Sequence, residues 1–186
     1  DHYVEEVAAL MTPFRFIPNW RMDDVMVSYA TDGGGVGPHF DQYDVFLIQG
    51  AGKRRWQIGR LCDASTPLRP HDDLRLLADF VPTQEWLLEP GDILYLPPGV
   101  SHDGVAVGPD CMTYSIGFRT PWYQELAEQF LVYLQDRIEI GGTYSDPDLK
   151  LQKHPSEIGG QMLKQVTKEI RKVRWDDGDV ANFLGC

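Results

Sequence analysis

Three side chains that can bind a metal follow the glycine-rich part of this 186-residue sequence, two of them directly and one further downstream. His39 and Asp41 follow the run Gly33-Gly-Gly-Val-Gly-Pro, and His102 closes the downstream segment Pro-Pro-Gly-Val-Ser-His. In an extended segment, positions i and i+2 point to the same side, so His39 and Asp41 present two ligands together. Two imidazoles and one carboxylate form the ligand set of non-haem iron(II) centres. The pattern predicts such a centre at His39, Asp41 and His102.

Arg54 is the candidate for binding an organic acid beside this metal. If residues 53–59 form a strand, Arg54 shares its apolar face with Trp56 and Ile58. A buried guanidinium needs an anion, and its planar fork binds a carboxylate through two hydrogen bonds. Three protein ligands leave metal positions for a bidentate 2-oxo acid and then O2. Arg54 is therefore expected to hold the distal carboxylate of that acid, and a structural ion pair is the alternative.

Simpler interpretations of these residues remain open. A His-x-Asp pair occurs often by chance, so His39 could be a turn residue bonded to the backbone. His102 could be a polar residue satisfied near a loop. What favours the metal site is the combination of the pair with the segment Pro90-Gly-Asp-Ile-Leu-Tyr-Leu-Pro, which precedes His102, and with an inward arginine.

The elements around these residues are mostly short strands separated by turn residues, which predicts an antiparallel barrel or jelly roll. Residues 1–12 have the spacing of a helix that stops before Pro13. The segment Gly50-Ala51-Gly52 is expected to be a hairpin turn. Residues 61–84 are expected to be an exposed insertion. The expected strands cover residues 23–31, 43–49, 53–59, 85–88, 93–96 and 111–118.

Alternation along two of these strands indicates which side chains line a pocket. Asp24, Met26 and Ser28 share one face of the first strand, whose other face, with Val25, Val27 and Tyr29, is expected to be ordinary packing. Thr113 and Ser115 share one face of the last strand. A carboxylate, an apolar wall and an aromatic ring suit an arginine or lysine side chain. The candidate substrate residues are Asp24, Met26, Tyr43 and Ser115. Core packing for Met26 and a surface role for Asp24 are the competing interpretations.

From Pro121 the hydrophobic period becomes helical, as in Trp122, Leu126, Phe130 and Leu134. A second helix is expected from about Ser156. We therefore expect a barrel in residues 1–120 and a helical region in residues 121–186 that braces it or forms a dimer. Both ends look like internal positions of a longer protein.

The net charge of −11 argues against direct, non-specific binding of nucleic acid and suits a basic protein partner. Solubility alone would explain the acidity equally well. Three cysteines without C-x-x-C spacing indicate neither zinc nor disulfides, so a reducing, cytoplasmic setting is expected. No apolar run approaches the roughly 18 residues of a membrane span, so no membrane association is expected.

Long stretches of the chain resemble the bacterial JmjC-type ribosomal oxygenases of the cupin and 2-oxoglutarate oxygenase superfamily, above all the arginine hydroxylases of ribosomal protein L-sixteen. The stretches that carry this resemblance are residues 10–15 (Leu-Met-Thr-Pro-Phe-Arg), 18–24, 33–46, 89–95, 114–119 and 141–148.

The resemblance implies a double-stranded β-helix followed by a helical dimerisation segment. It implies Fe(II) on His39, Asp41 and His102, 2-oxoglutarate on Arg54, and an arginine near the four candidate substrate residues. The implied reaction is hydroxylation at the β-carbon of an arginine in a large-subunit ribosomal protein, with succinate and CO2 as co-products.

Two departures from the family pattern accompany the resemblance. Thr113 stands where an Asn is expected near the cosubstrate, so Ser28 and Thr113 become the candidates for its proximal end. A C-terminal winged-helix-like domain is not recognised in the chain. Two other functions stay open: the same chemistry on a histidyl, asparaginyl or methyl-lysyl residue, and a metal-binding cupin without catalysis.

Overall fold

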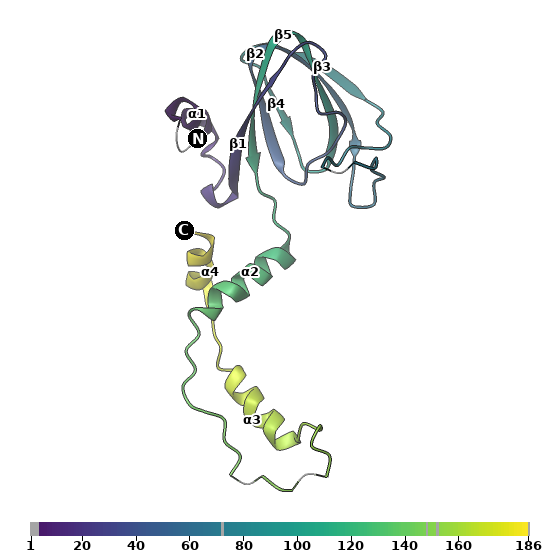
Figure 1. Cartoon of the computed structure of the whole chain (residues 1–186). Coiled ribbons are helices and arrows are strands. Elements are labelled where there is room, and N and C mark those ends of the chain that lie inside the picture. Colours follow the sequence, from purple (N-terminus) through teal and green to yellow (C-terminus); the bar gives the residue numbers. More distant parts are fainter. Residues whose placement is uncertain (1–3, 72, 148, 152, 186) are drawn as a thin grey trace. The chain divides into compact units, whose positions relative to one another are not determined.

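The structure, a computed structural model, describes residues 4–71, 73–147, 149–151 and 153–185, which fold as two units (Figure 1). The units are residues 1–120 and residues 121–186. The strands lie in the first unit, after helix α1 (Glu5–Met11) and two 3₁₀ turns (Thr12–Phe14 and Asn19–Arg21). They are β1 (Met22–Ala30), β2 (Asp44–Leu61), β3 (Gln84–Leu88), β4 (Ile93–Leu96) and β5 (Val100–Phe118).

Two long strands, β2 and β5, are the frame of the barrel. They pair antiparallel along their whole length, from Asp44 opposite Phe118 to Leu61 opposite Val100. On the other edge of β2, its first half pairs with β4 and its second half with β3. Strand β1 pairs with the end of β5. The predicted class, a mainly β, cupin-type barrel, is confirmed.

The predicted hairpin at Gly50-Ala51-Gly52 is wrong, because β2 runs through these residues without reversing. The pairing with β5 changes register on both sides of Ala51, which marks a bulge. A Cβ on Gly50 would lie 2.3 Å from Cε2 of Tyr114, and Gly52 has a φ of +59°. The two glycines therefore allow a bend and a close approach between strands rather than a turn.

Side chains of β2 alternate between two hydrophobic clusters, as the period of a strand requires. The inner cluster comprises Val45, Leu47, Trp56, Ile58, Leu88 and Leu96. The outer cluster joins Ile116 and Phe118 of β5 to Phe14, with Phe46 packed against them. Because Ile116 and Phe118 fill the outer cluster, the alternating positions Thr113 and Ser115 fall on the inner face of β5.

The segment expected to be an exposed insertion is partly buried. Leu77 is only 1% exposed, and its N–H donates to the carbonyl of Pro38 at 2.8 Å. Leu68 and Leu77 form a β-bridge, so these two residues lie side by side. The interpretation failed because the bond to Pro38 is a long-range contact. It fastens the insertion to the residue that precedes His39.

The described residues of the second unit form three helices: α2 (Tyr123–Gln135), α3 (Gly160–Ile170) and α4 (Asp177–Leu184). Helix α3 begins four residues after the expected Ser156, and α4 was not expected. Phe130 and Tyr133 of α2 contact Phe183 of α4, with ring centroids 5.4 and 5.7 Å apart. Helix α3 has no buried residue. None of the helices in the described ranges has the length and apolar character needed to cross a membrane.

Candidate metal centre

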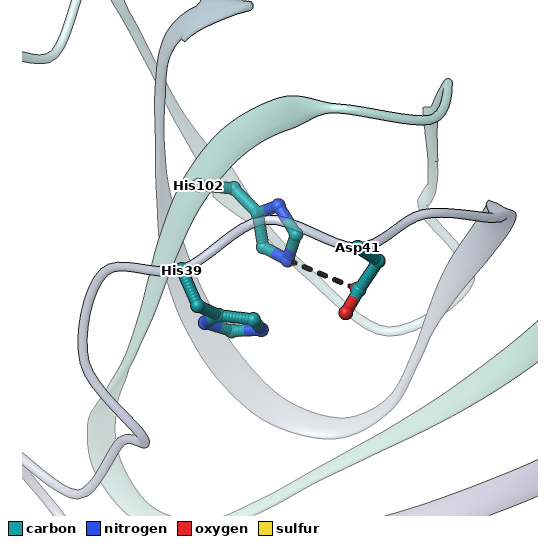
Figure 2. A group of neighbouring side chains, drawn as sticks. All are labelled: His39, Asp41 and His102. Carbon is teal, nitrogen blue, oxygen red and sulfur yellow. Dashed lines mark ion pairs between the residues drawn. The ribbon is translucent and has the colours of Figure 1, made fainter. Parts of the chain in front are cut away.

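The backbone brings the three predicted metal ligands together. The N–H of His39 donates to the carbonyl of His102 at 3.0 Å, and the N–H of His102 donates back at 2.8 Å. Gly99, just before β5, donates to the carbonyl of Asp41 at 2.7 Å. The segment after β1 is thus held against the start of β5, and ligand atoms of His39, Asp41 and His102 lie within 4.8 Å of one another (Figure 2).

Hydrogen bonds orient both imidazole rings. Nδ1 of His39 lies 2.8 Å from the carbonyl of Gly37, and Nδ1 of His102 lies 2.9 Å from the carbonyl of Val100. A carbonyl oxygen only accepts, so each Nδ1 carries the proton and each Nε2 keeps its lone pair. Nε2 of His102 is 3.7 Å from Oδ2 of Asp41, as the dashed line in Figure 2 marks.

Burial sets the protonation of the site. His102 is 3% exposed, and this burial, together with the neighbouring His39, lowers the pKa of its imidazole. The neutral ring is the form that binds a metal. Burial and the carboxylates of Asp41 and Asp24 raise the pKa of Tyr43 to about 12, so its phenol keeps its proton at neutral pH. The donor set fits a divalent cation of the iron(II) type, which these three side chains would hold.

Arg54 is buried, at 6% exposure, on the inner face of β2. Its Nε has no hydrogen-bond partner, and no carboxylate of the described residues lies within ion-pair distance of its guanidinium. Its guanidinium carbon is 5.7 Å from the ring centre of Trp56, whose ring centre is 5.8 Å from that of His102. A cation buried in this way favours a bound anion over the structural ion pair considered above.

The two residues predicted to contact the proximal cosubstrate, Ser28 and Thr113, are cross-strand partners. The Ser28 hydroxyl donates to the Thr113 carbonyl at 3.3 Å, and the Thr113 hydroxyl donates to Oε1 of Gln49 at 3.1 Å. Gln49 is 1% exposed and was missed by the sequence analysis. It continues the alternation of Val45 and Leu47, and that pattern could have identified it.

The four predicted substrate residues lie on adjoining strands and the loop before β2. Met26 is opposite Ser115 in the β1–β5 pair. A Cβ on Gly117 would lie 3.5 Å from Oδ1 of Asp24 and 3.6 Å from Cε2 of Tyr43, so these two side chains approach the same point. Asp24 is exposed and Met26 is 55% exposed, so neither is part of the hydrophobic core. Val27 and Tyr29, expected to be packed, are also more than 45% exposed.

A cavity of about 330 Å³ opens beside the metal ligands. His39, Asp41 and Tyr43 form one part of its lining, and residues 73–76 of the insertion form another. The cavity therefore gives access to the metal ligands His39 and Asp41. No local pattern in the sequence predicts that the insertion reaches the metal ligands.

Comparison with known proteins agrees with this geometry. Residues 9–126 match the JmjC domain family. The Escherichia coli protein named ribosomal protein uL16 3-hydroxylase is 49% identical over 167 residues, covering 89% of this chain and 44% of that protein. A probable ribosomal oxygenase of Haemophilus influenzae is 44% identical, covering 91% of this chain and 40% of that protein. The chain thus spans less than half the length of these relatives.

Solved structures agree as well. The X-ray structure of E. coli YcfD superposes with a TM-score of 0.75 at 42% identity, covering 99% of this chain and 49% of that chain. A structure of YcfD, a ribosomal oxygenase, in complex with cobalt and 2-oxoglutarate superposes with a TM-score of 0.70 at 41% identity, covering 99% of this chain and 47% of that chain. With its barrel, its ligand geometry and these matches, the chain belongs to the JmjC domain family.

Proposed function

We propose that this chain is the catalytic part of an Fe(II)- and 2-oxoglutarate-dependent oxygenase that hydroxylates an arginine of a large-subunit ribosomal protein. The single observation that carries the proposal is the buried Arg54, which has no ion-pair partner among the described residues, on the inner face of the barrel that holds His39, Asp41 and His102. A metal site alone fits many cupins. A metal site beside a buried cation without an anion fits a chelating ligand with a second, distal carboxylate.

The relatives support the choice of cosubstrate and substrate. The E. coli structure that superposes on this chain contains cobalt and 2-oxoglutarate, and cobalt commonly stands in for iron(II) in such ligand sets. The curated E. coli relative is named a 3-hydroxylase of ribosomal protein uL16, which corresponds to oxidation at a β-carbon.

The residues of this chain would divide the work as follows. His39, Asp41 and His102 hold the metal, and the carbonyls of Gly37 and Val100 keep the Nε2 lone pairs available. Arg54 holds the distal carboxylate, while Ser28 and Thr113 lie toward the proximal end. Bound iron(II) supplies the oxidising chemistry that places one oxygen atom of O2 in a C–H bond while 2-oxoglutarate becomes succinate and CO2. The apolar inner cluster keeps water from the reacting groups.

Asp24, Met26, Tyr43 and Ser115 would hold the substrate arginine. The Asp24 carboxylate supplies the counter-charge for a guanidinium, and the Tyr43 ring supplies a stacking surface. The net charge of −11 favours encounter with a basic ribosomal protein. Because such a substrate is made in the cytoplasm, we place the enzyme there.

We also propose that residues 1–120 are the catalytic barrel and residues 121–186 a dimerisation segment. Helix α3 buries none of its side chains. Its apolar residues Leu163 and Ile170 are 59% and 62% exposed. A helix with an apolar stripe is stable when that stripe packs against a partner. Light scattering at increasing concentration tests this: a dimer that Leu163→Glu converts into a monomer is expected, whereas a monomer at all concentrations would contradict it.

The activity is tested with a uL16 peptide that contains the candidate arginine, together with iron(II), ascorbate and 2-oxoglutarate. Mass spectrometry should show a gain of one oxygen and formation of succinate. Asp24→Ala should reduce the turnover of peptide by roughly ten- to one-hundredfold, since it removes the charged partner of the guanidinium. The matched control is Asp23→Ala, whose carboxylate pairs with exposed Arg119 at 3.2 Å and should matter little. Equal turnover by both variants would favour a neutral substrate residue.

A further inference from the structure

Trp56 carries a second unpartnered donor beside Arg54. Its side chain is 5% exposed, and its indole Nε1 is buried without a hydrogen-bond partner among the described residues. Buried polar groups almost always have a partner, so two orphaned donors on one face of one strand point to a missing acceptor. Protein groups of the described chain do not supply it.

The position of the indole narrows what that acceptor is. Trp56 lies between the two ends of the proposed cosubstrate site, with Arg54 5.7 Å from its ring centre and the metal ligand His102 5.8 Å from it. A Cβ on Gly104 would lie 2.5 Å from Cζ3 of Trp56. The benzene edge of the indole therefore packs against β5, and the opposite edge, which carries the N–H, faces away from that contact.

We propose that the indole N–H of Trp56 donates a hydrogen bond to the same distal carboxylate that Arg54 binds, which makes Trp56 a residue that positions the cosubstrate. A carboxylate has two oxygens and about four acceptor sites, so it can serve a guanidinium and an indole together. The inference rests on the proposed function, because it takes 2-oxoglutarate as the ligand. The requirement for an N–H explains why tryptophan, rather than another large aromatic residue, suits this buried position.

The first test follows the indole N–H directly by ¹⁵N NMR on the full 186-residue chain loaded with Zn(II). Five tryptophans give at most five indole signals. The Trp56 signal is assigned from the spectrum of Trp56→Phe or, if that variant does not fold, by replacing the other four tryptophans one at a time. Adding 2-oxoglutarate should shift the Trp56 N–H signal downfield. Pyruvate, which lacks the distal carboxylate, should leave the signal in place.

The second test measures affinity for 2-oxoglutarate by calorimetry. Trp56→Phe keeps a ring and removes the donor, so binding should weaken roughly tenfold to one-hundredfold, as expected for one hydrogen bond to a charged group. Trp86→Phe is the matched control, because Trp86 is the cross-strand partner of Trp56 and is 53% exposed. Zn(II) affinity should be the same in both variants.

The outcomes separate this inference from the proposed function. Binding of 2-oxoglutarate by the unaltered chain with no shift of the Trp56 signal, or with equal affinity in Trp56→Phe, would overturn the role of Trp56 alone. The N–H would then be bonded to a buried water. If the unaltered chain does not bind 2-oxoglutarate at all, both the inference and the proposed function are overturned.

Discussion

Replacing Arg54 with methionine should stabilise the cosubstrate-free protein and abolish cosubstrate binding. Methionine fills a similar volume without a charge. Removing poorly compensated buried charge in favour of apolar packing is worth about 1–4 kcal/mol. The lost contact of the guanidinium with the Trp56 ring offsets about 0.5–2 kcal/mol of this gain. A net gain of about 0.5–2 kcal/mol remains when the low ends and the high ends of these two ranges are subtracted.

That gain has a measurable size in a chain of this length. One kcal/mol shifts the midpoint of thermal unfolding by about 2–4 °C in a protein of 150–250 residues, so Arg54→Met should melt about 1–8 °C higher without 2-oxoglutarate. With 2-oxoglutarate at one hundred times its dissociation constant, the unaltered protein gains about 2.7 kcal/mol from binding and the variant gains none. The order of the two melting temperatures should therefore reverse.

Differential scanning fluorimetry of the Zn(II)-loaded chain, with and without 2-oxoglutarate, measures both effects. Arg55→Met is the control, because Arg55 is the exposed neighbour on the same strand and should shift neither value. Arg54→Met melting below the unaltered chain without cosubstrate would show that Arg54 stabilises the fold through contacts of its own. Arg54 would then not be a destabilising buried charge that awaits a bound anion.

Three further predictions follow from the same structure. Metal binding should weaken at least about tenfold in each of His39→Ala, Asp41→Ala and His102→Ala. The control His71→Ala changes an exposed loop residue and should leave metal binding unchanged, as a titration with metal ion measures. Gly35→Ala should destabilise the chain by about 1–3 kcal/mol, because its Cβ would lie 2.5 Å from the Gly104 carbonyl oxygen, and a urea-induced unfolding curve unchanged from that of the unaltered chain would contradict this. The metal-free chain should lose stability as pH falls below about 6.5. Burial lowers the pKa of His102 in the folded state, so the unfolded state takes up a proton at a higher pH than the folded state does. The loss should level off below the lowered pKa of the folded state. His102→Gln should remove this part of the slope in urea melts between pH 7.5 and 5.5, and an unchanged slope would assign it to other groups.

Local pattern was enough to predict most strands and the faces of their side chains. Alternation placed Arg54 beside Trp56 on the inner face and separated Thr113 from Ile116, because the two-residue period of a strand is a local property of the backbone. The same period places the side chains of His39 and Asp41, two residues apart, on one side of the chain.

The sequence by itself determined the barrel class, the metal-ligand types and the inward arginine. Tertiary structure alone decided that Gly50–Gly52 bends a continuous strand, that Leu77 fastens the insertion to Pro38, and that Gln49 meets Thr113. Each of these depends on a contact between residues more than about 30 positions apart, with Tyr114, Pro38 and Thr113 as the partners. Local propensity is blind to such contacts. The spacing of Gly50 and Gly52 alone indicates a turn, and only the position of the Tyr114 ring shows that the strand continues. In the same way, only the folded structure shows that a buried donor has no partner among the described residues.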